Sequence, residues 1–247
     1  MSVAPLPSHH PYYSRPASFP NVRDRLNRLT HRHLFLRSLV PAISFLDYGF
    51  LIPENASLSF LGDLSEISIV IKTAEVEDWH TAITASSFVN THQIEKRNDQ
   101  VTFKLIFQDA SQLNLRLYTA FCYRGKAYQN IDLVLEKVLI HRDGIKIANI
   151  CHSVEFHWLR SHELNRKFST DFRPLLLAQK PEKQVEAARY ICHKYRLESH
   201  RLFHLLTHTP TYRKSIERRM GFSGKRQKMA ILGLASLFQL FMLSPSS

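Results

Sequence analysis

Two polar side chains interrupt an aliphatic run in the first half of the chain. Glu66 and Ser68 lie two residues apart in Glu-Ile-Ser-Ile-Val-Ile, a strand pattern that places both side chains on the same side. A predicted glycine turn with Gly62 and Asp63 precedes them. Arg116 lies in a later strand pattern, and a guanidinium can form a bidentate contact with a phosphate. These residues therefore indicate chemistry with phosphate or with a divalent cation.

The elements that must position these residues follow from hydrophobic periodicity. One helical pattern, over 75–85, is enclosed by runs that alternate or are rich in β-forming residues, which predicts a β-α-β unit and then a meander. The predicted strands cover 57–61, 66–72, 88–94, 101–108, 113–119 and, after an Asp-Gly turn, 145–150. The predicted helices cover 21–46 with a kink at Pro41, 128–141, 153–168, 181–196, 197–208 and 210–220.

These patterns divide the chain into three segments. Residues 1–20 hold five prolines and no apolar run, which predicts a flexible arm. Residues 21–150 contain the predicted strands, and residues 151–247 read as helical and basic. We therefore expect an α+β fold, in which a small mixed or antiparallel sheet with flanking helices is followed by an all-helical C-terminal region.

The order of helix, strand, polar motif, helix and further strands resembles the polymerase-beta-like nucleotidyltransferase superfamily, in particular its divergent bacterial branch. The resemblance covers residues 22–168. In that family, one strand supplies two metal-binding carboxylates and a later strand supplies a third. The resemblance implies that Glu66 and Ser68 occupy the first two positions, that Arg116 faces the third, and that Gly62 and Asp63 are a remnant of the family's Gly-Ser phosphate loop.

The residues that differ from the family pattern are the carboxylates that catalysis requires. Two-metal nucleotidyl transfer needs several carboxylates around Mg²⁺ ions about 3.5–4 Å apart, and only Glu66 remains. We therefore expect Mg²⁺ binding to be weak or lost and catalysis to be degenerate. The expected ligand is a nucleotide or another phosphorylated small molecule, with Arg116 in place of a metal. Alternatively, Glu66 and Arg116 are an ordinary ion pair between neighbouring strands.

The charge distribution supports a second function class. The chain carries 33 Lys and Arg against 21 Asp and Glu, and the net charge is +5 over 1–46, −3 over 47–150 and +10 over 151–247. Basic flanks favour an anionic partner. The alternative to a nucleotidyltransferase-like protein is therefore a non-enzymatic module whose helices at 22–37 and 213–228 dock on nucleic acid, a membrane surface or an acidic protein.

The C-terminal segment is apolar, and cysteines and histidines are scattered along the chain. Residues 229–243 are apolar but span only about 22 Å as a helix, which is too short for a transmembrane span and suits a membrane-peripheral helix or one docked on the core. Three scattered cysteines indicate a reducing compartment, so we expect a cytoplasmic protein. His200, His204 and His208 share one helix face but lack a further ligand, so no metal site is assigned to them.

Overall fold

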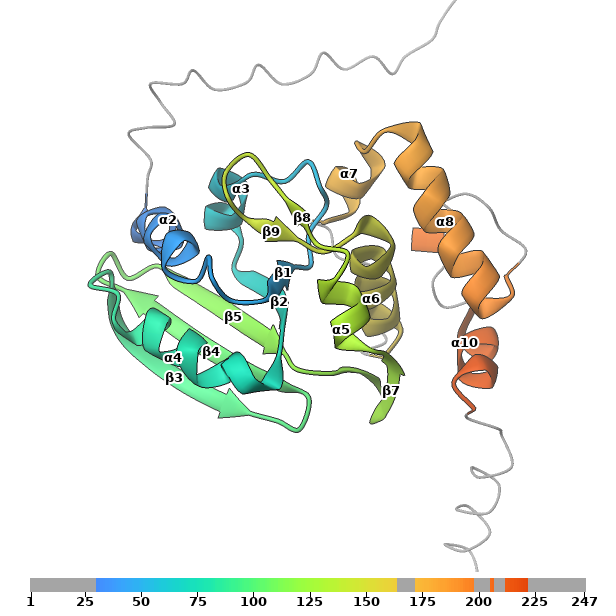
Figure 1. The fold of residues 1–247 in the computed structure, drawn as a ribbon, viewed down its shortest axis with the longest axis horizontal. Helices are drawn as coiled ribbons and strands as arrows, with labels where there is room; N and C mark the ends of the chain where they lie inside the picture. The colour runs from blue at the N-terminus through green and yellow to red at the C-terminus, as the bar shows by residue number, and fades with distance from the viewer. Residues whose placement is uncertain (1–29, 164–171, 198–204, 207–211, 222–247) are drawn as a thin grey trace, which may run out of the picture.

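A computed structural model describes residues 30–163, 172–197, 205–206 and 212–221, and a mixed sheet forms its centre (Figure 1). In these residues seven strands form the sheet, in the order β3-β4-β5-β2-β1-β9-β8, and two more form a separate ribbon. The strands are β1 (Tyr48–Phe50), β2 (Glu66–Ile71), β3 (Val89–Lys96), β4 (Gln100–Phe107), β5 (Gln112–Tyr118), β8 (Leu139–Ile140) and β9 (Lys146–Ile147), with β6 (Phe121–Tyr123) and β7 (Lys126–Gln129) in the ribbon.

Helices flank this sheet and continue beyond it. In Figure 1, α2 and α4 lie along the strands, whereas α6, α8 and α10 stand together beside the sheet. The helices are α2 (His31–Ala42), α3 (Leu58–Asp63), α4 (Val76–Thr84) after the 3-10 turn η1 (Thr73–Glu75), α5 (Ile131–Leu135), α6 (Ile150–Glu163), α7 (Phe172–Leu177), α8 (Pro181–Tyr195) and α10 (Arg213–Arg219). The predicted α+β fold with a mixed sheet, flanking helices and a helical C-terminal region is confirmed.

The alternation of the strands produces two different sheet faces. Odd-numbered residues of β2 and β5, such as Ile67 and Leu115, are fully buried and join Phe35 of α2 and Trp79 of α4 in the main core. On the opposite face a smaller cluster packs α5 and α6 against the sheet, and its members are Leu51, Val70, Tyr118, Phe121, Ile131, Val134, Ala148 and Phe156. The main core also includes residues of α6, α8 and α10, so the helices after residue 150 share it with the sheet.

The segment before β2 is a helix, so the predicted strand over 57–61 and the predicted glycine turn at Gly62 are wrong. The Ser57 hydroxyl accepts a hydrogen bond from the Phe60 backbone N–H at 3.3 Å, and this N-cap starts α3. Gly62 lies in this helix and is buried against α2, where a Cβ atom would stand 2.2 Å from the nearest ring atom of His33. Glycine is needed there because the two helices approach closely.

The region between β5 and α6 also differs from the sequence prediction. The expected helix over 128–141 is only α5, which the Asn130 side chain caps by accepting the Asp132 N–H at 2.9 Å, and short strands flank it. The strand expected over 145–150 contains only β9. The β6-β7 hairpin and β1 were not predicted. The hairpin turns through Arg124 and Gly125, both with positive φ.

Most other predicted elements lie within a few residues of the observed ones. The strands over 66–72, 88–94, 101–108 and 113–119 and the helices over 75–85 and 181–196 correspond to β2, β3, β4, β5, α4 and α8. The expected helix over 21–46 is described from residue 30 and ends at Ala42, next to Pro41. The helix expected from 153 begins at Ile150, and the one expected over 210–220 is α10. The segments 1–20 and 229–243 lie outside the described residues.

A search of the described residues finds no helix with both the length and the apolar character that crossing a bilayer requires.

The close contact between α3 and α2 leads to a stability prediction. We expect Gly62→Ala to lower the free energy of unfolding by about 1–3 kcal/mol, because its Cβ overlaps the His33 ring. Helix propensity alone would change the stability by about 1 kcal/mol in the opposite direction. Urea unfolding of Gly62→Ala in the wild-type and the His33→Ala background measures the effect. An equal loss in both backgrounds would rule out the ring as the cause.

Candidate functional site

The pairing of β2 with β5 and β4 assembles a polar strip on one face of the sheet. β2 and β5 are parallel, and Glu66 pairs with Asn114 and Ser68 with Arg116. On its other side Arg116 pairs with Thr102 of antiparallel β4. Residues that pair across strands point to the same face, so these five side chains share the face opposite the main core.

Glu66 and Arg116 meet on this strip. The Arg116 Nη2 atom lies 2.6 Å from Glu66 Oε2, and the two side chains are 24% and 37% exposed. The Nε atom of Arg116 is buried and has no hydrogen-bond partner among the described residues. Ser68 and Thr102, on the strands on either side, are buried. The guanidinium is therefore held by one carboxylate while a second donor of the same group is unsatisfied.

Sequence reasoning missed Asn114. It lies directly opposite Glu66 in the register of β2 and β5 and shares the polar face with Arg116. The signal was the strand period of two, because residues 114 and 116 must point to the same side of β5. Which of the two would lie opposite Glu66 depends on the register, and only the tertiary pairing fixes it.

The residues of the polar strip do not fit a pair of magnesium ions. Mg²⁺ requires several oxygen ligands, and two-metal sites share carboxylates between the ions. The strip offers the Glu66 carboxylate, whose Oε2 is already paired with a guanidinium, and a fixed cation at that position repels a divalent ion. Among the described residues no group of three or more His, Cys, Asp and Glu side chains is arranged to hold a metal.

Gly62 and Asp63, the other two residues singled out from the sequence, contact α2. The space above Gly62 is filled by the His33 ring, and the Asp63 carboxylate lies 3.3 Å from His33 Nε2. The His33 ring also contacts the Thr30 hydroxyl through Nδ1 at 2.9 Å. Among the described residues, the contacts of Gly62 and Asp63 thus serve helix packing, and none of them joins either residue to Glu66 or Arg116.

A small pocket lies beyond the polar strip, where β5 leads into β6 and α6 passes behind. Its walls include Tyr118 of β5, Cys122 of β6, and Arg160 and Glu163 of α6, together with Asp99 before β4. Tyr118 is two residues after Arg116 on the same strand and only 2% exposed. The pocket therefore adjoins the strip through Tyr118.

The Tyr118 hydroxyl connects the charges of the strip and the pocket. It is buried and has no hydrogen bond of ordinary geometry to the described residues. Burial raises the pKa of Tyr118, while the positive charges of Arg160 and Arg116 oppose this increase. The Arg160 guanidinium stacks over the Tyr118 and Phe156 rings, at 5.4 and 6.0 Å from their centroids. A neutral hydroxyl thus lies close enough to two guanidinium groups to be influenced by both.

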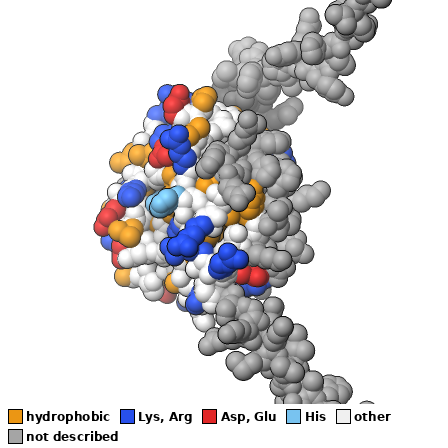
Figure 2. All heavy atoms as spheres, turned by 90° about the vertical axis from the view of Figure 1, so that its right-hand side faces the viewer, with side chains coloured by type: hydrophobic (Ala, Val, Ile, Leu, Met, Phe, Trp, Pro, Cys, Tyr) orange, Lys and Arg blue, Asp and Glu red, His pale blue; other side chains and the backbone are white. Residues whose placement is uncertain are grey.

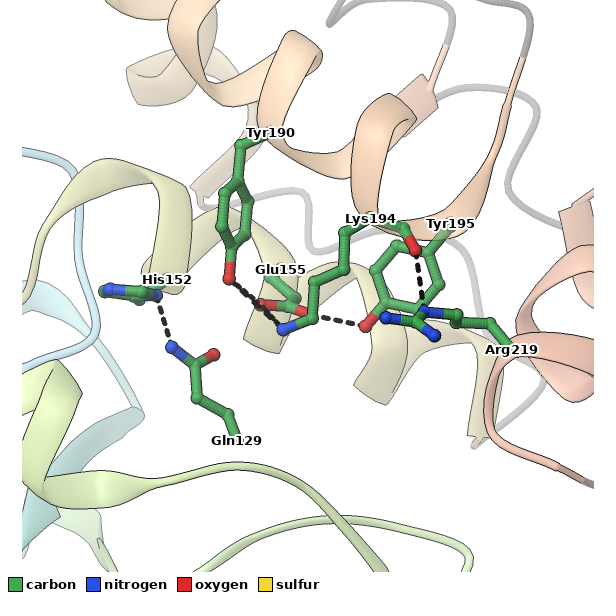
Figure 3. A network of polar contacts seen from close by, with 7 residues as sticks. All are labelled: Gln129, His152, Glu155, Tyr190, Lys194, Tyr195 and Arg219. Atoms are coloured by element: carbon green, nitrogen blue, oxygen red, sulfur yellow. Dashed lines mark hydrogen bonds and ion pairs between the residues drawn. The ribbon is translucent and has the colours of Figure 1, made fainter.

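A buried carboxylate joins α6 to α8 (Figure 3). Glu155 of α6 is completely buried, and Lys194 Nζ donates to its two oxygens at 2.7 and 2.9 Å. The hydroxyls of Tyr190, at 2.8 Å, and Tyr195 donate to the same carboxylate. Burial and the negative charge of Glu155 raise the pKa of both tyrosines, so they remain donors at neutral pH. These donors all lie on α8, so Glu155 links α6 to α8. We call Glu155, Tyr190, Lys194 and Tyr195 the clamp.

The hairpin and α10 extend this clamp. The Lys194 ammonium lies over the Tyr128 ring of β7, at 5.7 Å from the centroid, and the Lys194 carbonyl accepts a hydrogen bond from Arg219 Nε at 3.0 Å. Arg124 at the hairpin turn pairs with Glu217 of α10 at 2.8 Å. Figure 2 shows Lys and Arg side chains near the centre of this side of the molecule, with an acidic side chain beside them.

Two further buried histidines lie on α6, the helix that carries Glu155. Gln129 Nε2 contacts His152 Nδ1 at 2.6 Å, and His157 Nε2 contacts the Leu51 carbonyl at 2.6 Å. Burial lowers the pKa of His152 to about 4, and the charge of Lys194 acts in the same direction. Burial also lowers the pKa of His157 to about 4, against the hydrogen bond to Leu51. Both imidazoles are therefore neutral near pH 7.

Comparisons with protein-family models, with curated proteins and with solved structures find no match to this chain. The resemblance to the nucleotidyltransferase superfamily therefore stays a prediction from the motif. His200, His204 and His208 lie outside the described residues.

Removal of the buried carboxylate tests the clamp. We expect Glu155→Gln to lower the free energy of unfolding by about 3 kcal/mol, because Lys194 is left largely buried without its counter-charge. The double variant Glu155→Gln/Lys194→Met removes both charges and should lose less than the sum of the two single variants. Chemical unfolding of all four proteins gives the coupling, and strict additivity would contradict the pairing.

The buried histidines predict a pH dependence of stability. In the folded state their pKa is about 4, below the ordinary value of about 6.5, so the unfolded chain binds more protons between these values. We expect the free energy of unfolding to fall as the pH drops from 6.5 to 4, by roughly 3 kcal/mol for each histidine. The double variant His152→Asn/His157→Gln retains an acceptor and a donor, and its pH slope should be flatter. An unchanged slope would contradict the prediction.

Proposed function

We propose that this chain is a nucleotidyltransferase-like protein that binds a nucleotide or another phosphorylated small molecule on the polar strip and has lost two-metal catalysis. Arg116 is the main phosphate ligand of this proposal. Ser68 and Asn114 line the strip beside it, and Arg160 adds a second cation across the Tyr118 hydroxyl.

The proposal is supported most directly by the incomplete hydrogen bonding of the Arg116 guanidinium. Its guanidinium is only about a quarter exposed, pairs with Glu66 through Nη2, and leaves a buried Nε without a partner among the described residues. An unsatisfied buried donor costs about 1–3 kcal/mol. A phosphate oxygen would satisfy this donor, and guanidinium binds phosphate with strong, charge-assisted hydrogen bonds. The nearby Arg160 charge favours the same anion.

The same arrangement argues against metal-dependent turnover. The positions that the resemblance assigns to a second and a third carboxylate hold a hydroxyl and a guanidinium, at Ser68 and Arg116, and the residue opposite Glu66 is the neutral Asn114. Binding through fixed cations needs no divalent ion. The proposal is therefore a binding function at the position where the family has its catalytic site.

The described parts of the two basic segments contact their own chain. In 22–37, Arg32 donates through Nη1 to the backbone carbonyls of Leu64 and Gln112 at 3.1 and 3.3 Å. In 213–228, Glu217 and Arg219 take part in the contacts around Lys194 and the hairpin. Residues 22–29 and 222–228 lie outside the described residues. Docking of these segments on an anionic partner stays a prediction.

Substitution of Arg116 tests the proposed binding. We expect stabilisation of the wild-type protein by millimolar pyrophosphate, nucleoside triphosphates or nucleotide sugars, and at least a tenfold loss of affinity in Arg116→Ala. Arg142→Ala is the matched control, because Arg142 is 84% exposed and far along the chain from the strip. Thermal shift followed by calorimetry measures both variants. Indifference of the wild-type protein to every phosphorylated compound would overturn the proposal.

Removal of the Glu66 carboxylate should increase the affinity for phosphate, whereas removal of Arg116 should decrease it. Glu66→Gln takes away the negative charge that holds Arg116 and repels phosphate, so we expect it to bind pyrophosphate severalfold more tightly than the wild type. Weaker binding by this variant, in titrations at low salt, would contradict the roles given to the pair. Robust Mg²⁺-dependent release of pyrophosphate from a nucleoside triphosphate, abolished by Glu66→Ala, would show that catalysis persists.

A further inference from the structure

The pocket beside Tyr118 carries unlike charges that do not pair with each other. Arg160 lines it from α6, and among the described residues no carboxylate lies within ion-pair distance of its guanidinium. Asp99 and Glu163 line the same pocket, and neither carboxylate forms an ion pair in the described residues. These opposite charges share a small pocket but form no ion pair with each other. A ligand with one anionic and one cationic group can therefore pair with each of them.

Both acids of the pocket act on the thiol of Cys122, which lines the same pocket. Burial raises the pKa of the Cys122 thiol, and the carboxylates of Asp99 and Glu163 raise it further. The potential at the Cys122 sulfur is therefore negative, which favours a cation and keeps the thiol protonated. Glu163 is held in place because its Oε1 accepts the Arg124 backbone N–H at 2.7 Å.

The opposite wall of the pocket is positive and carries a buried hydroxyl, which also interacts with Arg116. The Tyr118 hydroxyl is buried, lies on the pocket wall and has no hydrogen bond of ordinary geometry to the described residues. Arg160 is held over the Tyr118 ring, and Arg116 acts on the same hydroxyl from the strip. An anionic oxygen at this point would accept from the hydroxyl and face two guanidinium groups.

We propose that this pocket selects phosphorylated ligands that carry a protonated amine, with the phosphoryl group at Tyr118, Arg160 and Arg116 and the ammonium group between Asp99 and Glu163. This inference rests on the proposed phosphate binding at Arg116 and adds the chemical class of the ligand. The walls of the pocket also include Tyr128 and Phe156, whose rings can pack against an apolar linker between the two charges.

Three small phosphate esters distinguish the contribution of the phosphate group from that of the amine. Phosphoethanolamine carries a phosphate and an ammonium group, glycerol 3-phosphate replaces the ammonium group by hydroxyls, and methyl phosphate carries the phosphate group alone. We expect calorimetry to give phosphoethanolamine at least a tenfold higher affinity than the other two. In Asp99→Asn/Glu163→Gln this preference should fall to about one, while methyl phosphate binding changes little. Asp78→Asn, an exposed acid on α4, is the matched control.

The outcomes distinguish the two proposals. Methyl phosphate binding that depends on Arg116, without a preference for the amine or with an equal preference for glycerol 3-phosphate, would overturn the amine selectivity and leave the phosphate site. A preference that survives the double substitution would overturn the roles of Asp99 and Glu163. Absence of binding by all three esters would overturn the amine selectivity, while the phosphate site itself is decided by the titrations with pyrophosphate and nucleoside triphosphates.

Alkylation of Cys122 provides a second measurement at the pocket. Cys122 is partly exposed, whereas Cys151 and Cys192 are buried, and burial raises the pKa of Cys151 to about 12. We expect iodoacetamide at pH 8.5 to modify Cys122 first, and phosphoethanolamine to slow this reaction more than methyl phosphate does. Mass spectrometry identifies the modified residue, and Cys122→Ser is the control. Equal rates with and without phosphoethanolamine at saturating concentration would contradict occupation of the pocket.

Discussion

The parallel pairing of β2 with β5 is the constraint on which the core and the polar strip both depend. One register places Ile67 beside Leu115 in the main core and Ser68 beside Arg116 on the opposite face. Side chains alternate along a strand, so a slip by one residue would turn the guanidinium into the apolar core and the aliphatic side chains out of it. The burial of the core therefore fixes the position of the polar groups, and no separate device is needed to align them.

The guanidinium of Arg116 decides which kind of ligand this face of the sheet can hold. A strip with several carboxylates attracts divalent cations, whereas Arg116, with Arg160 nearby, attracts an oxyanion. Glu66 is the remaining acid of the motif, and it holds Arg116 and also competes with an external anion. The strip and the pocket adjoin at Tyr118, so the proposed amine selectivity assigns the rest of the ligand to Asp99 and Glu163.

The helices after the sheet explain part of the high positive charge of the chain. Glu155 is buried without water contact, and a buried carboxylate requires charged or hydroxyl donors, which Lys194 and two tyrosines provide. The backbone of Lys194 in turn accepts from Arg219, and Arg124 pairs with Glu217. These cations hold α6, α8, α10 and the hairpin together. The same packing positions Arg160 and Glu163 of α6 at the pocket.

The sequence by itself determined the elements whose signal is local. Runs that alternate or are rich in β-forming residues were sufficient for β2, β4 and β5, helical spacing was sufficient for α4, and Pro181 and Glu182 in the first turn were sufficient for the start of α8. It did not determine α3, where the Ser57 cap and the contact with His33 outweigh a strand-like run, or the β6-β7 hairpin, whose strands are short. In the site, the residue types at 66, 68 and 116 already excluded a full set of metal carboxylates. That Asn114 lies opposite Glu66, and that Asp99, Cys122 and Arg160 line one pocket, was decided only by the tertiary structure, because strand register and the crossing of α6 bring together residues far apart in the chain.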